Sequence, residues 1–486
     1  MEHGGLIGMF GVIGSVILVT ALLSGLLERS RLPQILVFLA MGVVLGPLGL
    51  GVVDLGIRSA TVQAIATVGL VLVLFTDSVS VRLPELKRQA KLAAIILGPG
   101  TLLTAAVNAV AAHYLLGTGI AESAILGAAL ASTDPVLLRG LLRGSVAPAE
   151  ARNALRIESG MNDAVLVPVI LIAMSALVTG EGASTPWMST AIQVFVLGAG
   201  AGVVVGFIAV GALDLVRKRM GMRRDYESLY ALGVALAAFA IAESVHGSGF
   251  IAAFASGITV AALDVELCDC FYDYGEATAE MALIFTFVAL GSSAIWSGLG
   301  VADARTLAFA AVALFSRALI LVPALAGSDM DARSRRFVVW FGPRGLSSLL
   351  LVLLPVFAGV AGSERLFAVT SLVVLLSIVI HGGSQMLVRP AAPLGTIETA
   401  SPPLVTPSAA GSAEVVEDED RVTLQELDAL QREGRRVVVL DVRTDTAYES
   451  EETQARGAIR ASPERAVQAV RTLGLPPDTW LASYCA

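Results

Sequence analysis

Residues 156–165 read RIESGMNDAV and open a long apolar run of the chain. They place two carboxylates, Glu158 and Asp163, where a membrane-spanning helix ordinarily carries no charge, and Asn162 precedes the second of them. A carboxylate in the hydrocarbon of a bilayer is costly, so an acidic residue in such a place marks a functional site. The stretch therefore predicts a membrane helix that carries a polar site.

The composition of the whole chain agrees with a polytopic membrane protein. The 486 residues are 55% hydrophobic and 15% charged, and the mean hydropathy is +0.77. The apolar excess lies before residue 390, in runs of about 20 residues, which is the length that spans a bilayer core. The first ten residues lack a basic segment, so we expect a retained span there rather than a cleaved signal. Three cysteines provide neither a disulfide framework nor a full set of metal ligands.

The apolar runs predict an all-α polytopic protein with thirteen transmembrane helices. Lys and Arg concentrate in alternate loops, with nineteen on one side of the predicted membrane and three on the other. The positive-inside rule then places the N-terminus outside the cell and the C-terminus in the cytoplasm. The acidic segment 264–280 falls on the cytoplasmic side, as a loop between the ninth and tenth spans. The predicted spans are 6–27, 33–50, 60–80, 92–116, 120–138, 157–179, 187–215, 227–245, 249–264, 279–299, 304–326, 337–360 and 365–388.

Two of these spans contain a proline motif that predicts a broken helix. The fifth carries STDPV at 132–136, and the twelfth carries GPRG at 342–345. If spans one to six and eight to thirteen form two repeats, each motif falls in the fifth helix of its repeat. Broken helices at matching positions indicate a transporter site between inverted repeats.

The proline of the first motif predicts which backbone atoms become available. Pro135 has no N–H, so the carbonyl of Ala131 loses its helical hydrogen bond. Pro135 also disfavours the helical conformation at Asp134. Membrane proteins tolerate such a break beside a cavity or other protein. We therefore expect Asp134 and the Thr133 hydroxyl to lie at a polar site.

The opening stretch presents two polar faces on one helix. Residues four apart share a face, so Ser159 and Asp163 point together, and Glu158 and Asn162 form a second pair. Oxygen ligands of this kind suit a hard cation. The sequence therefore predicts a cation site formed by this helix and the broken helix that precedes it.

Four charged residues in or near spans need an interpretation. Glu158 requires a cationic partner if it is ionised; Arg344 in the GPRG break is the first candidate, and Arg317 is the second. We expect a Glu158–Arg344 pair that clamps the sixth span against the twelfth, because removing one member of a buried pair strands the other charge. Asp77, at the end of the third span, is either an interfacial carboxylate or part of the ion path.

Five motifs together resemble the monovalent cation:proton antiporters, in the branch of NhaP and the sodium/proton exchangers. The resemblance covers residues 1 to about 390. In chain order the motifs are STDPV, ESGMNDAV, AESVHGSGFIAAF, the arginine of SRALI, and FGPRGL.

This resemblance implies an inverted-repeat antiporter fold, a core domain that moves against a dimer domain, and a homodimer. It also implies that Asp163 and Asp134 carry the cation and the proton, with Ser159 and Thr133 as supporting ligands. We expect no cofactor, no catalytic residue and no nucleic-acid partner. The expected partners are a monovalent cation, a proton, the lipid bilayer and a second copy of the chain.

Two positions refine the resemblance. Asn162, before Asp163, looks like the mark of the electroneutral branch, because related electrogenic antiporters have two adjacent aspartates. Asp77 matches an acidic position that this branch usually fills with Glu. The shorter side chain leaves open whether Asp77 contacts the ion directly or through water.

Residues after the antiporter region, 1–390, differ in character. Residues 391–420 are rich in Pro, Ser and Ala and predict a flexible linker. Residues 421–486 predict a small α/β unit that resembles part of a rhodanese domain, with VVVLDVR as its first strand and TWLASYCA leading to Cys485. A rhodanese needs a loop of backbone N–H groups after that cysteine. Only Ala486 follows here, so we expect no sulfur transfer.

The function predicted from these observations is electroneutral exchange of Na⁺ or Li⁺ for H⁺ in the cell membrane. Two clustered carboxylates in low dielectric resist being ionised together, so a proton or a cation can neutralise them in competition. K⁺/H⁺ exchange is the alternative among antiporters. A cation channel and a membrane-anchored sulfurtransferase-like protein are alternatives from other classes.

Overall fold

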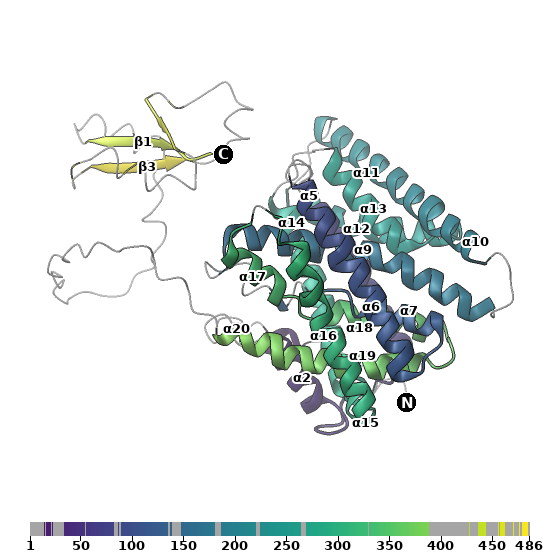
Figure 1. Ribbon diagram of the computed structural model, residues 1–486. Helices are drawn as coiled ribbons and strands as arrows, with labels where there is room; N and C mark the ends of the chain where they lie inside the picture. Colours follow the sequence, from purple (N-terminus) through teal and green to yellow (C-terminus); the bar gives the residue numbers. More distant parts are fainter. Residues whose placement is uncertain are drawn as a thin grey trace. The chain divides into compact units, whose positions relative to one another are not determined.

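The computed structural model describes most of residues 34–387 and short pieces of the tail (Figure 1). Two compact units, Met1–Thr396 and Ile397–Ala486, divide the chain, and each is described by itself. The described residues are 14, 16–20, 22, 34–53, 55–81, 86, 89–134, 137–138, 147–179, 186–219, 224–263, 269–328, 330–387, 427, 436–443, 455, 457–461, 470, 476 and 479–484.

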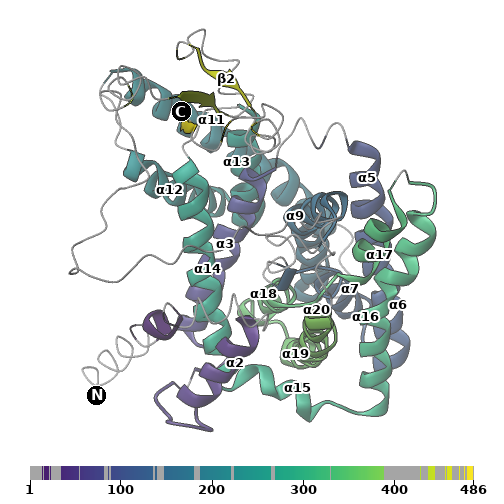
Figure 2. The same cartoon turned by 90° about the vertical axis from the view of Figure 1, so that its left-hand side faces the viewer.

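The first unit is helical and consists of two groups of packed helices, which Figure 2 separates. The first bundle contains α2 (Gln34–Leu45), α3 (Ala60–Val79), η3 (Gln193–Gly198), α11 (Ala199–Arg219), α12 (Arg224–Ser244), α13 (Gly249–Ala262) and α14 (Asp269–Ser292). The second bundle contains α5 (Ala90–Ile95), η1 (Ile96–Leu103), α6 (Thr104–Ala111), η2 (Ala112–Leu116), α7 (Ile120–Ala129), α9 (Ala149–Thr179), α16 (Ala304–Ala324), α17 (Ala332–Trp340), α18 (Leu346–Phe357), α19 (Ser363–Ser377), η5 (Ile378–Gly382) and α20 (Gly383–Leu387).

Short helices connect the two bundles. α10 (Pro186–Ile192) leads from α9 into η3, and η4 (Ala294–Trp296) with α15 (Ser297–Gly300) leads from α14 toward α16. Within the second bundle, α7, α9, α18 and α19 pack together, and α9 also meets α3 and α13 of the first bundle. The middle of α9 therefore lies where the two bundles meet.

Within the described residues, six helices are long and apolar enough to cross a membrane, or seven if the bent pair Met281–Ser292 and Ala294–Gly300 forms one span. Five shorter apolar helices accompany them, including Ile120–Ala129 and Leu346–Phe357. These two adjoin the proline motifs, and a helix that stops at a break is too short to span alone. The first predicted span, 6–27, lies largely outside the described residues.

Two predicted boundaries are wrong. The sixth span was expected to begin at 157, but α9 begins at Ala149, so Glu158 lies in the third turn of a 31-residue helix. The acidic segment 264–280 was expected to be a loop, but α14 begins at Asp269. Helix-forming residues such as Ala277 and Glu280 extend the apolar helix toward its N-terminus, because charge alone does not end a helix.

The second unit contains a small parallel sheet of three strands. β1 (Val437–Asp441) lies between β2 (Ile459–Arg460) and β3 (Trp480–Tyr484), with Val437 opposite Trp480 and Leu440 opposite Ile459. Asp441, at the end of β1, is buried and forms an ion pair of 2.7 Å with Arg443. Hydrogen bonds from Arg443 hold the pKa of the Asp441 carboxyl well below its usual range. The whole linker 391–420, and Cys485, lie outside the described residues.

Candidate functional site

The two proline motifs meet in the second bundle. α7 ends at Ala129, and residues 132–134 belong to neither a helix nor a strand. Residues 341–345, between α17 and α18, are likewise outside any helix or strand. The backbone N–H of Asp134 donates to the carbonyl of Pro343 at 3.0 Å. Two segments more than 200 residues apart in sequence are therefore joined at their non-helical parts. Pro135 itself lies outside the described residues.

Arg344 satisfies the carbonyls that the first break leaves free. Its guanidinium is fully buried, and Nη1 donates to the carbonyls of Ala131 at 2.9 Å and Ser132 at 3.1 Å. Its backbone N–H donates to the Ser377 hydroxyl at 2.7 Å. Both carbonyls follow Leu130, the C-cap of α7. Arg344, from the second break, therefore holds the segment that leaves α7.

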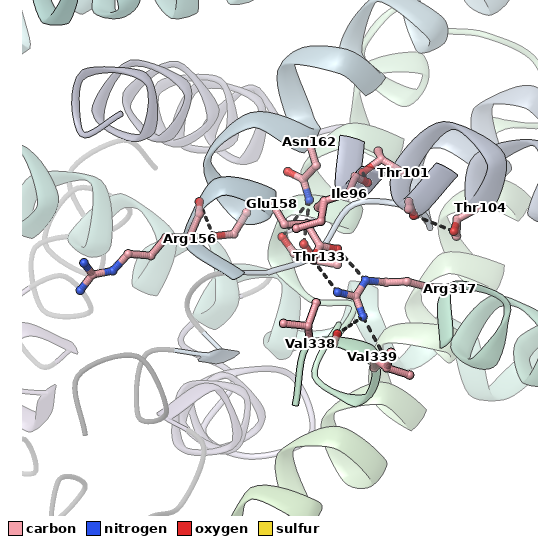
Figure 3. Close-up of polar contacts among 12 residues, drawn as sticks. Ile96, Thr101, Thr104, Thr133, Arg156, Glu158, Asn162, Arg317, Val338 and Val339 are labelled. Atoms are coloured by element: carbon pink, nitrogen blue, oxygen red, sulfur yellow. Dashed lines mark hydrogen bonds and ion pairs between the residues drawn. The ribbon is translucent and has the colours of Figure 1, made fainter. Parts of the chain in front are cut away.

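The expected Glu158–Arg344 pair is wrong, and Arg317 takes that place. Arg317, from α16, donates through Nε and Nη2 to the two carboxylate oxygens of Glu158 at 2.5 Å each. Its Nη1 donates to the carbonyls of Val338 and Val339 near the end of α17, as Figure 3 shows. The planar fork of Arg suits this two-pronged contact. Glu158 and Arg317 thus connect α9, α16 and α17. Nη1 of Arg344 bonds to backbone oxygens instead, and its Nε and Nη2 have no hydrogen-bond partner in the part of the chain that the structure describes.

Steric constraints explain why the first and last positions of the GPRG motif are glycines. A Cβ on Gly342 would lie 2.6 Å from Nη1 of Arg317, and a Cβ on Gly345 would overlap the carboxyl group of Asp134. Only glycine lets the backbone pass so close to these side chains. The motif therefore lets the Arg317 guanidinium and the Asp134 carboxyl group pack directly against the second break.

Asp134 caps the helix that follows the second break. Its Oδ2 accepts a hydrogen bond of 2.7 Å from the backbone N–H of Leu346, the first residue of α18. Asp134 is 1% exposed. The positive end of a helix dipole stabilises a carboxylate placed there. The structure thus shows Asp134 binding a helix N-terminus, an interaction that the sequence analysis did not predict.

Asp163 faces the first break from α9. Its Oδ1 accepts a hydrogen bond from the Ser132 hydroxyl at 2.5 Å, and the side chain is 4% exposed. The Ser347 hydroxyl, in the first turn of α18, is a further side-chain partner, and Asp134 lies near enough for the two charges to interact. Asp163 is thus surrounded by both breaks.

Asn162 fastens α9 to the neighbouring residue of the break. Its Nδ2 donates to the Thr133 hydroxyl at 2.8 Å and more weakly to the Thr133 carbonyl at 3.4 Å; Figure 3 shows the amide directed at Thr133. Asn162 is fully buried, and its Oδ1 has no hydrogen-bond partner among the described residues. An unpaired buried carbonyl oxygen is costly, so this atom is available to a ligand or a water.

Two further predicted residues border this cluster. Ser159 is 5% exposed, and its hydroxyl bonds weakly to the carbonyl of Arg156 in its own helix, at 3.5 Å. Asp77 lies on α3 of the first bundle, and a Cβ on Gly160 would come within 3.9 Å of its Cβ. Gly160 is one turn before Asp163, so the backbone and Cβ of Asp77 lie beside α9 at the boundary between the bundles.

The sequence analysis missed three hydroxyl residues of this site. Ser132 stands inside the STDPV motif and Ser347 directly after FGPRGL, so both were adjacent to positions that had been singled out. Ser377 has no such signal in the sequence. Helical spacing did not assign any of the three, because their contacts depend on how two non-helical segments cross.

Comparison with known proteins shows which family the chain belongs to. The family model described as "Sodium/hydrogen exchanger, transmembrane" matches residues 16–388, which include both breaks and all of α9. The chain belongs to this exchanger family. Its fold is shared with the solved structure of the sodium proton antiporter MjNhaP1 from Methanocaldococcus jannaschii at pH 8. The TM-score is 0.64 at 20% identity, over 79% of this chain and 98% of that one.

Relatives in the family carry names for different cations. The K(+)/H(+) antiporter NhaP of Alkalimonas amylolytica is 28% identical over 379 residues, 77% of this chain and 65% of the relative. The chain thus covers just under two thirds of that protein's length. The Na(+)/H(+) antiporter NhaP of Pseudomonas aeruginosa is 27% identical over 412 residues, 77% of this chain and 95% of the relative.

Proposed function

We propose that this chain exchanges a monovalent cation, Na⁺ or Li⁺, for H⁺ across the membrane, with Asp163 as the shared binding group. One observation carries the proposal: the two buried carboxylates of α9 have different partners. Glu158 is neutralised by Arg317, whereas the side-chain hydrogen-bond partners of Asp163 among the described residues are neutral hydroxyls. A buried carboxylate without a cationic partner needs a proton or a metal cation to neutralise it.

The surrounding oxygens suit a small cation that has lost its water. Asp163 supplies a charge, and the free Oδ1 of Asn162 lies one residue away on the same helix. We keep Asp134, Thr133, Ser159 and Asp77 as further ligands of the cation or proton, directly or through water. Hard cations prefer such oxygen donors. Because one carboxylate serves both ligands, cation and proton bind in competition.

We further propose the complete antiporter architecture. It comprises thirteen transmembrane helices in two inverted repeats, a homodimer, and a cell-membrane location with the N-terminus outside and the C-terminus in the cytoplasm. The crossing of two broken helices supports the repeats, since sites between inverted repeats use such helices. The boundary between the bundles at α9 supports movement of the second bundle, as a core domain, against the first. The excess of Lys and Arg in alternate loops supports the orientation.

The choice of cation is tested by transport in proteoliposomes. Purified protein is reconstituted into vesicles whose interior is more acidic than the surrounding buffer, so that the proton gradient is directed outward. Uptake of Na⁺, Li⁺ and K⁺ is then measured separately. The proposal expects accumulation of Na⁺ or Li⁺ driven by the gradient. Accumulation of K⁺ alone supports K⁺/H⁺ exchange instead. Flux that only dissipates a cation gradient and never couples to pH indicates a channel and contradicts the proposal.

The same vesicles test charge balance. If one cation exchanges for one proton, no net charge moves, so an imposed membrane potential should leave the initial rate unchanged. A net charge would feel about 2.3 kcal/mol per 100 mV. The rate is measured with potentials of either sign, set by an ionophore for an ion that the protein does not carry. A rate that follows the potential contradicts electroneutral exchange and the weight given to Asn162.

For the tail, 421–486, we propose a partial rhodanese-like unit connected by the linker 391–420. The parallel order β2-β1-β3 and the buried Asp441–Arg443 pair support this, since the Asp-Val-Arg segment occupies the end of the central strand as the resemblance implies. Sulfur transfer forms no part of the proposal.

A further inference from the structure

Ser132 is held from two sides in the middle of the first break. Its backbone carbonyl accepts a hydrogen bond from Nη1 of Arg344 at 3.1 Å and lies 3.5 Å from the hydroxyl of Ser348. Its own hydroxyl donates to Oδ1 of Asp163 at 2.5 Å. The residue is fully buried. The buried guanidinium of Arg344 therefore fixes the backbone from which the hydroxyl reaches Asp163.

The chemistry of a hydroxyl lets this contact change with the occupant of the site. A serine hydroxyl has one donor and two acceptor lone pairs, and its hydrogen rotates to suit its partner. Toward an ionised, empty carboxylate it donates, as the present geometry allows. Toward a bound cation it presents its oxygen, with the hydrogen turned away. Ser132 thus stays in contact with Asp163 in both situations without moving its backbone.

We propose that Ser132 is a specificity-determining residue of the exchange reaction, whose hydroxyl oxygen is a ligand of the transported cation beside Asp163. This inference rests on the proposed function and deepens it at one residue. Ser159, by contrast, bonds to its own helix. Of the two serines, Ser132 is the one whose hydroxyl is directed at the carboxylate in this structure.

The consequence for cation affinity has a definite sign. Hard cations prefer oxygen ligands, and Ser132→Ala removes one such oxygen from the site. At alkaline pH, where the proton no longer competes, the half-saturation constant for the cation should therefore rise. The maximal rate should change less, because excess cation still fills the site.

The experiment measures initial exchange rates in proteoliposomes against cation concentration at alkaline pH. Ser132→Ala is compared with Ser132→Thr, which keeps a hydroxyl and should restore the original half-saturation constant. The matched control is Ser256→Ala in α13, where a fully buried hydroxyl bonds at 2.8 Å to Ala253 of its own helix. This control should leave the half-saturation constant unchanged.

The outcomes separate this inference from the function on which it rests. A raised half-saturation constant in Ser132→Ala, with recovery in Ser132→Thr, supports it. A reduced maximal rate with an unchanged half-saturation constant overturns it and leaves Ser132 a packing residue. Absence of coupled exchange in the unmodified protein contradicts the proposed function itself. If Ser132→Ala does not fold, Ser132→Cys is measured instead. Its soft sulfur is a poor ligand for a hard cation, so the half-saturation constant should rise there too; an unchanged constant overturns the inference.

Discussion

Replacing Asp163 by Asn should abolish coupled exchange in a protein that still folds. The amide keeps the shape of the side chain, and its oxygen can still accept the hydrogen bond from Ser132. It carries no negative charge and takes up no proton in the relevant pH range. Cation uptake driven by a pH gradient should therefore fall to the level of liposomes without protein. Transport is measured beside the melting temperature of the purified variant, which should remain close to that of the original protein.

Asp303→Asn provides a matched control for this change. Asp303 is the N-cap of α16, where its Oδ1 accepts a hydrogen bond of 2.7 Å from the backbone N–H of Thr306. Asn is also a good residue at this position of a helix. The control should therefore transport normally. Coupled exchange that persists in Asp163→Asn would remove Asp163 from the centre of the mechanism.

Breaking the Glu158–Arg317 pair should cause the largest loss of stability. Both side chains are about 2% exposed. Removing one partner of a buried pair leaves the other charge uncompensated, which costs roughly 3–5 kcal/mol. Arg317→Ala strands the carboxylate and also frees the carbonyls of Val338 and Val339, so it should be worse than Glu158→Gln. Thermal unfolding of each variant in detergent measures the effect.

An exposed pair in the same chain calibrates this result. Arg58 and Glu364 lie 2.9 Å apart, but their side chains are 58% and 60% exposed. Because water screens such a pair, Glu364→Gln should cost less than about 1 kcal/mol. If Glu158→Gln retains its stability and instead changes the half-saturation constant for the cation, Glu158 belongs to the ion site rather than to the support of the bundle.

The breaks could be predicted from the sequence because their causes are local. Proline removes a helical hydrogen bond wherever it stands, so STDPV and GPRG indicated interrupted helices. The two polar faces of α9 could likewise be predicted from the sequence, because helical spacing places Glu158, Asn162 and Asp163 on neighbouring faces. The start of α9 was less certain, since the polar residues before Glu158 are compatible with both a loop and a helix.

The pairing of charges could not be predicted in this way. Arg317 and Arg344 were both plausible partners of Glu158, and the choice depends on which backbone oxygens each guanidinium meets. Arg344 reaches the carbonyls of Ala131 and Ser132, so its place is fixed by the crossing of two non-helical segments. The capping of α18 by Asp134 and the contact of Ser132 with Asp163 depend on the same crossing. No helical periodicity describes a non-helical segment, and these contacts join residues far apart in the chain.

The half-saturation constant for the cation, measured against pH, tests the central claim most directly. If cation and proton compete for Asp163, the constant should rise as the pH falls. In the acidic limit the rise should approach tenfold per pH unit for one coupled proton, or about 1.4 kcal/mol. The maximal rate should change less, because excess cation displaces the proton. A half-saturation constant that stays the same across this pH range would contradict competition at a single carboxylate.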